Sequence, residues 1–160
     1  TKPYIFKKGS EKYIIEAIKS VYEEMPELLK TQVSELFKLL SNMDSYPILI
    51  NCRAGKDRTG FAVALIQFAI GMSEDFIMLD YLKSNDFYLT KAEKWLTITT
   101  IISFGKFPVN NIKIIFTAYE EYLKTAINRI NNDYLGISGY LQYCGVDENE
   151  INKLKSLLLE

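Results

Sequence analysis

Residues 47–60 read PILINCRAGKDRTG, and this segment carries the clearest structural signal in the chain. It opens with a short apolar run at 47–50, which predicts a buried β-strand. A loop with glycine and basic residues follows. From Phe61 to Ile70 the chain is apolar enough for a buried helix, which Gly71 would close. The segment therefore predicts a strand, a polar loop and a helix in succession.

The remainder of the chain is predicted to be mainly helical. Apolar residues recur at helical spacing from Ser10 to Ser41, and Pro26 is expected in the first turn of the second of two helices. Three further helices are expected, over 73–85, 111–131 and 147–159. The segment 95–107 is apolar and rich in β-branched residues, so its assignment stays open.

Chain length and strand count together set the expected fold class. With 160 residues, 48% of them hydrophobic, the chain can bury one core, and we expect a single domain over 1–160. A lone strand cannot form a sheet, so the partner strands are expected upstream of Thr1. The prediction is an α/β domain with more helix than strand, either an N-terminally truncated fragment or a reduced form.

Composition excludes several classes of function. The chain has 19 basic and 20 acidic residues, which argues against nucleic-acid binding through bulk charge. It has no histidine, which excludes Ser-His-Asp and Cys-His catalysis within the chain. Two cysteines are too few for a disulfide framework or a zinc cluster. No apolar run is long enough for a membrane-spanning helix. We expect no metal and no cofactor.

The loop itself has the composition of a phosphate-binding site. Cys52 and Arg58 are separated by five residues at the start of a helix, where unpaired backbone N–H groups and the helix dipole favour an anion. Gly55 gives the backbone freedom to curl around a tetrahedral oxyanion. The Arg58 guanidinium can hold two phosphate oxygens at once. The predicted phosphate-binding residues are Arg53, Ala54, Gly55, Lys56 and Arg58.

The same loop predicts cysteine-based phosphoryl transfer. A thiol at a helix N-terminus beside basic groups is acidic enough to be largely thiolate near neutrality, so Cys52 is expected to attack phosphorus and form a phosphocysteine. Asp57 is the first candidate for protonating the leaving group. Thr59 is expected to assist departure of the sulfur. Lys56 adds positive charge, which suits multiply phosphorylated substrates or a lipid headgroup.

These residues also allow interpretations other than phosphoryl transfer. Cys52 could be a buried structural thiol. The nucleotide-binding P-loop is a closer competitor, but Ile50 stands where its first glycine belongs and Asp57 where its Ser or Thr binds magnesium. Asp80 could assist catalysis, although a helix-pairing role is commoner. Cys144 could trap an oxidised Cys52, although a free buried thiol is the safer prediction. The segment 95–107 could form a lid, although core packing is commoner.

The run CRAGKDRTG, residues 52–60, resembles the active-site loop of the bacterial tyrosine/serine phosphatases within the protein-tyrosine-phosphatase superfamily. The similarity continues through residues 61–85 and into the C-terminal segment that precedes the last helix. It implies hydrolysis of phosphotyrosine, and also of phosphoserine, phosphothreonine or phosphoinositides. It also implies that Cys52, Lys56, Asp57 and Arg58 occupy the positions of the family's nucleophile, lysine, in-loop acid and arginine.

The chain departs from the family's pattern in two places. The family has histidine immediately before the cysteine, whereas this chain has Asn51. The family's N-terminal strands have no counterpart before Thr1, and they could carry a second acid. A catalytically weak or inactive phosphate-binding pseudophosphatase is therefore the rival hypothesis. Expected partners are phosphoproteins or phosphoinositides, and the expected location is the bacterial cytoplasm or, after secretion, a host cell.

Overall fold

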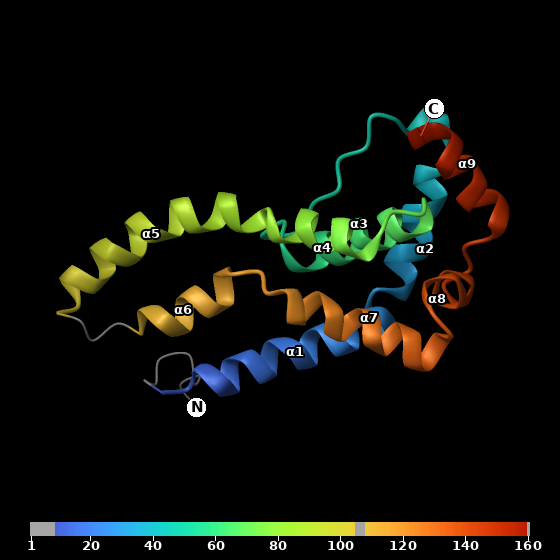
Figure 1. Cartoon of the computed structure of the whole chain (residues 1–160). Helices are drawn as coiled ribbons and strands as arrows, with labels where there is room; N and C mark the ends of the chain where they lie inside the picture. The colour runs from blue at the N-terminus through green and yellow to red at the C-terminus, as the bar shows by residue number, and fades with distance from the viewer. Residues whose placement is uncertain (1–8, 105–107, 160) are drawn as a thin grey trace.

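The computed structural model describes residues 9–104 and 108–159, without the side chains of 87–95. Nine α-helices and one short 3₁₀ helix form this described part (Figure 1). The bounds are α1 Glu11–Leu28, α2 Lys30–Leu40, η2 Met43–Ser45, α3 Asp57–Ala69, α4 Glu74–Leu82, α5 Ser84–Ile102, α6 Val109–Phe116, α7 Glu120–Tyr134, α8 Ile137–Tyr143 and α9 Glu148–Leu159.

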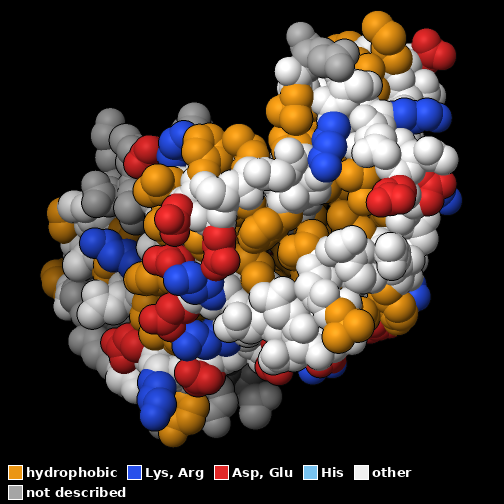
Figure 2. Space-filling model, turned by 45° about the vertical axis from the view of Figure 1, so that its right-hand side comes forward, with side chains coloured by type: hydrophobic (Ala, Val, Ile, Leu, Met, Phe, Trp, Pro, Cys, Tyr) orange, Lys and Arg blue, Asp and Glu red, His pale blue; other side chains and the backbone are white. Residues whose placement is uncertain are grey.

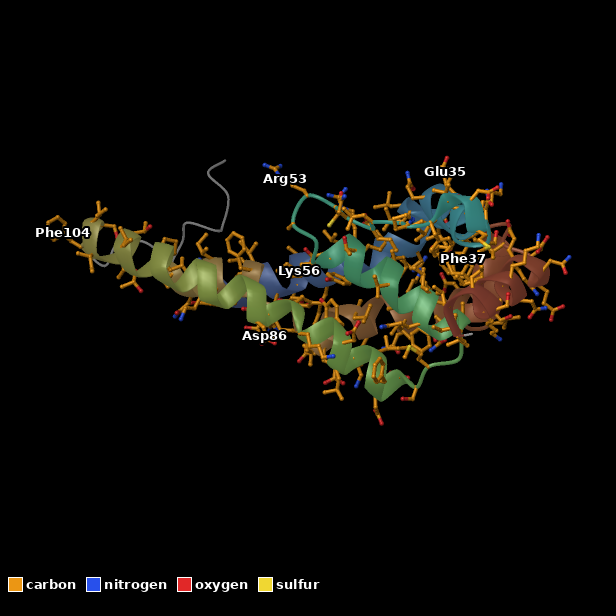
Figure 3. The ribbon with its side chains drawn as sticks, turned by 90° about the horizontal axis from the view of Figure 1, so that it is seen from above. Glu35, Phe37, Arg53, Lys56, Asp86 and Phe104 are labelled. Atoms are coloured by element: carbon orange, nitrogen blue, oxygen red, sulfur yellow. The ribbon has the colours of Figure 1, made fainter. Side chains whose placement is uncertain are left out.

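The core lies where α1 and α7 pack side by side against α3, α4 and α8 (Figure 1). Its largest fully buried side chains include Tyr22, Phe37, Phe61, Tyr122 and Tyr140. Helices α5 and α6 pack on each other and extend away from this core, and Phe104 lies at the far end of α5 (Figures 1 and 3). The catalytic-loop candidate, residues 51–60, therefore sits on the helical core beside the base of the α5–α6 pair.

Charged side chains of both signs are interspersed on the face drawn in Figure 2, and hydrophobic side chains gather in a hollow between them. This face offers no large patch of a single sign, as the near-neutral composition predicts. Within the described ranges, no helix is both long and apolar enough to cross a membrane.

The predicted strand at 47–50 does not form. Residues 9–104 and 108–159 contain no β-strand, so this segment has no ladder partner there. It keeps an alternating exposure: Ile48 and Ile50 pack against the core, whereas Leu49 is 84% exposed. The described part of the chain is thus helix-rich, and the predicted α/β class is not confirmed within it.

Two predicted helix boundaries are wrong. Pro26 lies inside the last turn of α1, and the second helix begins at Lys30. The helix expected over 111–131 is broken into α6 and α7 at residues 117–119. The break is stabilised by tertiary contacts that the local sequence cannot show: Asn85 receives a hydrogen bond from the Ala118 N–H and donates one to the Ala118 carbonyl. Lys56 binds two further carbonyls at the same place.

The helix ends with recognisable caps are where the sequence predicts them. Gly71 takes a φ of 91° after α3, a left-handed conformation that glycine adopts without strain. The Ser73 hydroxyl accepts the Phe76 N–H at the start of α4. Asp147 and Glu150 exchange reciprocal hydrogen bonds at the start of α9, which is a capping box. The open segment 95–107 belongs to α5 as far as Ile102, while residues 105–107 lie outside the described part.

Candidate active site

The loop between residues 50 and 57 joins the extended segment to the first turn of α3. Gly55 has a φ of 69°, so the chain turns here in the left-handed region that glycine favours. Because α3 begins at Asp57, the residues Asp57, Arg58 and Thr59 all lie in its first turn. Figure 3 shows Arg53 at the tip of the loop, pointing away from the helices, and Lys56 at its base, against them. Asp57, Arg58 and Thr59 are thus gathered at one helix N-terminus, whereas Arg53 points away from it.

Cys52 lies at the rim of this turn with its sulfur partly exposed. The Gly55 N–H donates a hydrogen bond to Sγ at 3.1 Å. Partial burial opposes ionisation, but the Thr59 side chain and the backbone N–H groups of Thr59, Ala54 and Gly55 outweigh it and lower the pKa of the thiol to about 7. A substantial fraction of Cys52 is therefore thiolate at neutral pH.

The Thr59 hydroxyl is close enough to Cys52 to influence its thiol. Its Oγ1 is buried and makes no regular hydrogen bond to any described residue. It still acts on the sulfur, because it favours the ionised form and lowers the Cys52 pKa. We interpret it as a donor whose acceptor is the thiolate; its assistance to sulfur departure remains a prediction.

Arg58 lines two of the hollows that border the loop. The smaller, about 250 Å³, is lined by Cys52, Arg58 and Thr59 together with apolar residues of α2. The larger, about 640 Å³, is lined by Lys56, Asp57 and Arg58 and by the apolar face of α1. The Arg58 side chain is exposed. Cys52 and Arg58 thus line one common hollow, which is large enough for a phosphate group.

Lys56 is placed differently from what its charge suggested. Its side chain is only 4% exposed, and Nζ donates to the backbone carbonyls of Ile115 at 2.8 Å and Thr117 at 3.2 Å. Nζ also lies 3.2 Å from Asp57 Oδ1. Burial lowers the pKa of the ammonium, an effect that the Asp57 carboxylate opposes. In this arrangement Lys56 binds the α6–α7 break from behind the loop, and its contact with phosphate remains a prediction.

One carboxylate oxygen of Asp57 accepts a hydrogen bond from a pair of hydrogen-bonded tyrosines in the core. The Tyr22 hydroxyl donates to Asp57 Oδ1 at 2.7 Å, and a second hydrogen bond of 2.7 Å joins Tyr22 to Tyr81. Sequence reasoning missed both tyrosines, because Tyr22 belongs to a helical apolar stripe that reads as core. No local signal marks its hydroxyl as a partner of a residue 35 positions away.

Gly60 explains how Tyr81 reaches this network. A Cβ atom at position 60 would lie 2.7 Å from Cδ2 of Tyr81, closer than real contacts allow. Glycine in the first turns of α3 therefore lets the tyrosine ring of α4 pack directly on the helix backbone. Asp80, on the same helix, accepts a hydrogen bond from Gln67 of α3 at 2.9 Å, which is a helix-pairing contact.

The other candidates from the sequence lie either on the exposed part of the loop or in the core. Asn51, Arg53 and Ala54 are exposed on the loop. Cys144 is a free thiol, 5% exposed, as expected of a buried cysteine. Within the described residues, no cluster of three or more His, Cys, Asp or Glu side chains could hold a metal ion.

Comparison with known proteins decides the family. Residues 4–160, nearly the whole chain, match the profile of the tyrosine phosphatase family. The chain belongs to this family. The family resemblance of the loop is thereby confirmed, and the match extends over residues 4–160 on both sides of the loop.

Two curated relatives of this phosphatase-family chain are similar to different extents. It is 32% identical over 123 residues to the triple specificity protein phosphatase PtpB of Mycobacterium tuberculosis. The aligned segment covers 71% of this chain and 44% of PtpB. It is 53% identical over 38 residues to a putative tyrosine-protein phosphatase of Cupriavidus necator, H16_A0669. This aligned segment covers 24% of this chain and 14% of the relative. The matched part is thus less than half the length of either relative.

Proposed function

We propose that this chain hydrolyses phosphate monoesters through a phosphocysteine at Cys52. The observation that supports it most is the environment of the sulfur: donors from the loop and from Thr59 lower its pKa to about 7, and it shares a hollow with Arg58. A thiolate that faces a phosphate-sized hollow beside a guanidinium is equipped for nucleophilic attack on phosphorus.

The reaction would proceed in two steps. In the first, the Cys52 thiolate attacks phosphorus, the bond to the ester oxygen breaks, and Asp57 gives that oxygen a proton. In the second, Asp57 as carboxylate takes a proton from water, which attacks phosphorus and breaks its bond to sulfur. Thr59 donates to the departing sulfur. Arg58 and the backbone N–H groups of residues 53–56 would hold the phosphate oxygens in both steps.

The substrate class in this proposal is phosphotyrosine first, with phosphoserine, phosphothreonine and phosphoinositides as further classes. The name of PtpB, a triple specificity protein phosphatase, supports more than one class for a similar sequence. The proposal includes the α/β architecture of the family, in which residues 47–50 would pair with other strands. Phosphorylated protein or lipid is the expected partner.

A phosphate-binding pseudophosphatase is the second candidate. It is favoured by Asn51, which replaces the family's histidine beside the nucleophile, and by Lys56, whose ammonium is engaged behind the loop. Such a protein would bind phosphate groups at the same loop without turning them over.

The two candidates are separated by turnover of para-nitrophenyl phosphate. We expect phosphate release from the wild-type chain and loss of essentially all turnover in Cys52→Ser, because serine is a far weaker nucleophile in this site. Tyr122→Phe, which removes a buried core hydroxyl without a hydrogen-bond partner among the described residues, serves as the matched control and should keep wild-type activity. Binding of phosphotyrosine or phosphoinositide without turnover by either protein would favour the pseudophosphatase.

A further inference from the structure

We propose that Tyr22 is a positioning residue for proton transfer by Asp57. Tyr22 and Lys56 hold Oδ1 of the carboxyl group, so that Oδ2 is the oxygen that carries the proton to and from the reacting oxygens. This inference rests on the function proposed above and assigns a role to a residue of α1 that the loop sequence does not contain.

The geometry of the carboxyl group supports this assignment. Both described contacts run to the same oxygen: Tyr22 donates at 2.7 Å and Lys56 Nζ lies at 3.2 Å. The Asp57 side chain is 35% exposed and borders the hollow of about 640 Å³ that it shares with Arg58. The carboxyl group is therefore anchored on its protein side and accessible on its other side.

The anchor itself is rigid. Tyr22 is fully buried in α1, and its hydroxyl is also hydrogen-bonded to Tyr81 of α4, which is 5% exposed. Burial raises the pKa of the Tyr22 hydroxyl far above its ordinary range, and Tyr81 and Asp57 add to this effect. Tyr22 thus remains a neutral donor throughout and never supplies the transferred proton. A carboxyl group held by two helices in this way loses rotational freedom before the substrate arrives.

The buried hydroxyl at position 22 contrasts with another tyrosine in the same core. The Tyr122 ring lies 5.7 Å from the Tyr22 ring, and its hydroxyl is buried with no hydrogen-bond partner among the described residues. A tyrosine hydroxyl can therefore occur here without a function in the site. At position 22, by contrast, the hydroxyl points to the one carboxyl group in the loop.

The test is the dependence of rate on the leaving group in Tyr22→Phe, which removes the hydroxyl and keeps the ring. Para-nitrophenolate departs without a proton, whereas phenolate from phenyl phosphate needs one. We expect kcat/KM for phenyl phosphate to fall roughly tenfold or more, and kcat/KM for para-nitrophenyl phosphate to change little. This parameter reports formation of the phosphocysteine and not its hydrolysis, which is the same step for both substrates. The ratio of the two rates is independent of the folded fraction, so partial misfolding cannot mimic this result.

Two further variants complete the experiment. Tyr122→Phe removes a neighbouring hydroxyl and should leave the ratio of rates at its wild-type value. Tyr22→Phe added to Asp57→Asn should cost nothing more for phenyl phosphate, because the residue to be positioned no longer carries a proton. Equal loss of kcat/KM on both substrates, or full additivity with Asp57→Asn, would overturn the role of Tyr22 and leave the phosphatase proposal standing. Absence of wild-type turnover would overturn both.

Discussion

Cys52 carries the chemistry of the proposed reaction, and its acidity comes from its immediate neighbours. Burial opposes ionisation, so the lowered pKa depends on hydrogen bonds from the loop backbone and from Thr59. The family's histidine beside the cysteine is absent, and Asn51 in its place is exposed. The loop backbone and Thr59 are therefore sufficient to bring the thiol into the neutral range.

Alkylation of Cys52 by iodoacetamide tests this acidity. Only the thiolate reacts, so the rate should be low in acid, rise through a midpoint at about pH 7 and level off above it. In Thr59→Ala, which loses one stabilising donor, the midpoint should move upward. Cys144 is an internal control, because burial raises the pKa of its thiol and it should react slowly until the protein unfolds.

The measurement follows the Cys52 peptide by mass spectrometry at each pH. A midpoint near that of the unfolded chain, about 8.5, would mean that the loop does not stabilise the thiolate. An unchanged midpoint in Thr59→Ala would mean that the Thr59 hydroxyl does not lower the pKa of Cys52. The backbone donors would then be the remaining cause.

The candidate residues of the loop follow from local sequence, and their roles stay predictions. The spacing of Cys52 and Arg58, the glycine between them and the helix behind them are all local features. Tyr22, Tyr81 and the placement of Lys56 could not be predicted, because their hydrogen bonds join residues 35 to 61 positions apart. The sequence shows that Lys56 is charged, but it does not show which groups its buried ammonium binds.

Among the elements, the break between α6 and α7 is hydrogen-bonded to Lys56 of the loop and to Asn85. Helix α6 ends at Phe116, and the carbonyls of Ile115 and Thr117 are bound by Lys56. The apolar periodicity of 111–131 predicts one continuous helix, so the break follows from tertiary contacts. By contrast, the caps at Gly71, Ser73 and Asp147 could be predicted because their hydrogen bonds are local.

Lys56→Met tests this link between the loop and the α6–α7 break. The change keeps most of the buried side chain but leaves two carbonyls without their donor, so we expect a loss of about 1–3 kcal/mol in the free energy of unfolding. Chemical denaturation measures it. Lys83→Met is the matched control, because Lys83 is 67% exposed and its nearest carboxylate is 3.6 Å away, and it should change stability by less than about 0.5 kcal/mol.

The same variant separates two roles for Lys56. A structural role predicts lower stability with little change in KM for para-nitrophenyl phosphate. A direct contact with phosphate predicts unchanged stability and a higher KM, and that result would contradict the placement described here.

At the scale of the whole molecule, helices distant in sequence build the site. α1 supplies Tyr22, α4 supplies Tyr81, and the α6–α7 break supplies the carbonyls for Lys56. The loop at the start of α3 lies among them (Figure 1). The helix-rich character was predictable from apolar periodicity. The strand at 47–50 was not confirmed, because a strand needs a partner and the described residues supply none.

The central claim is that phosphorus is transferred to the sulfur of Cys52. It is tested most directly by acid-quenching the reaction with radiolabelled phosphotyrosine peptide within one turnover and mapping the label. The account predicts label on the peptide that contains Cys52, and none in Cys52→Ser. Turnover without label on the protein, or label on another residue, would contradict it.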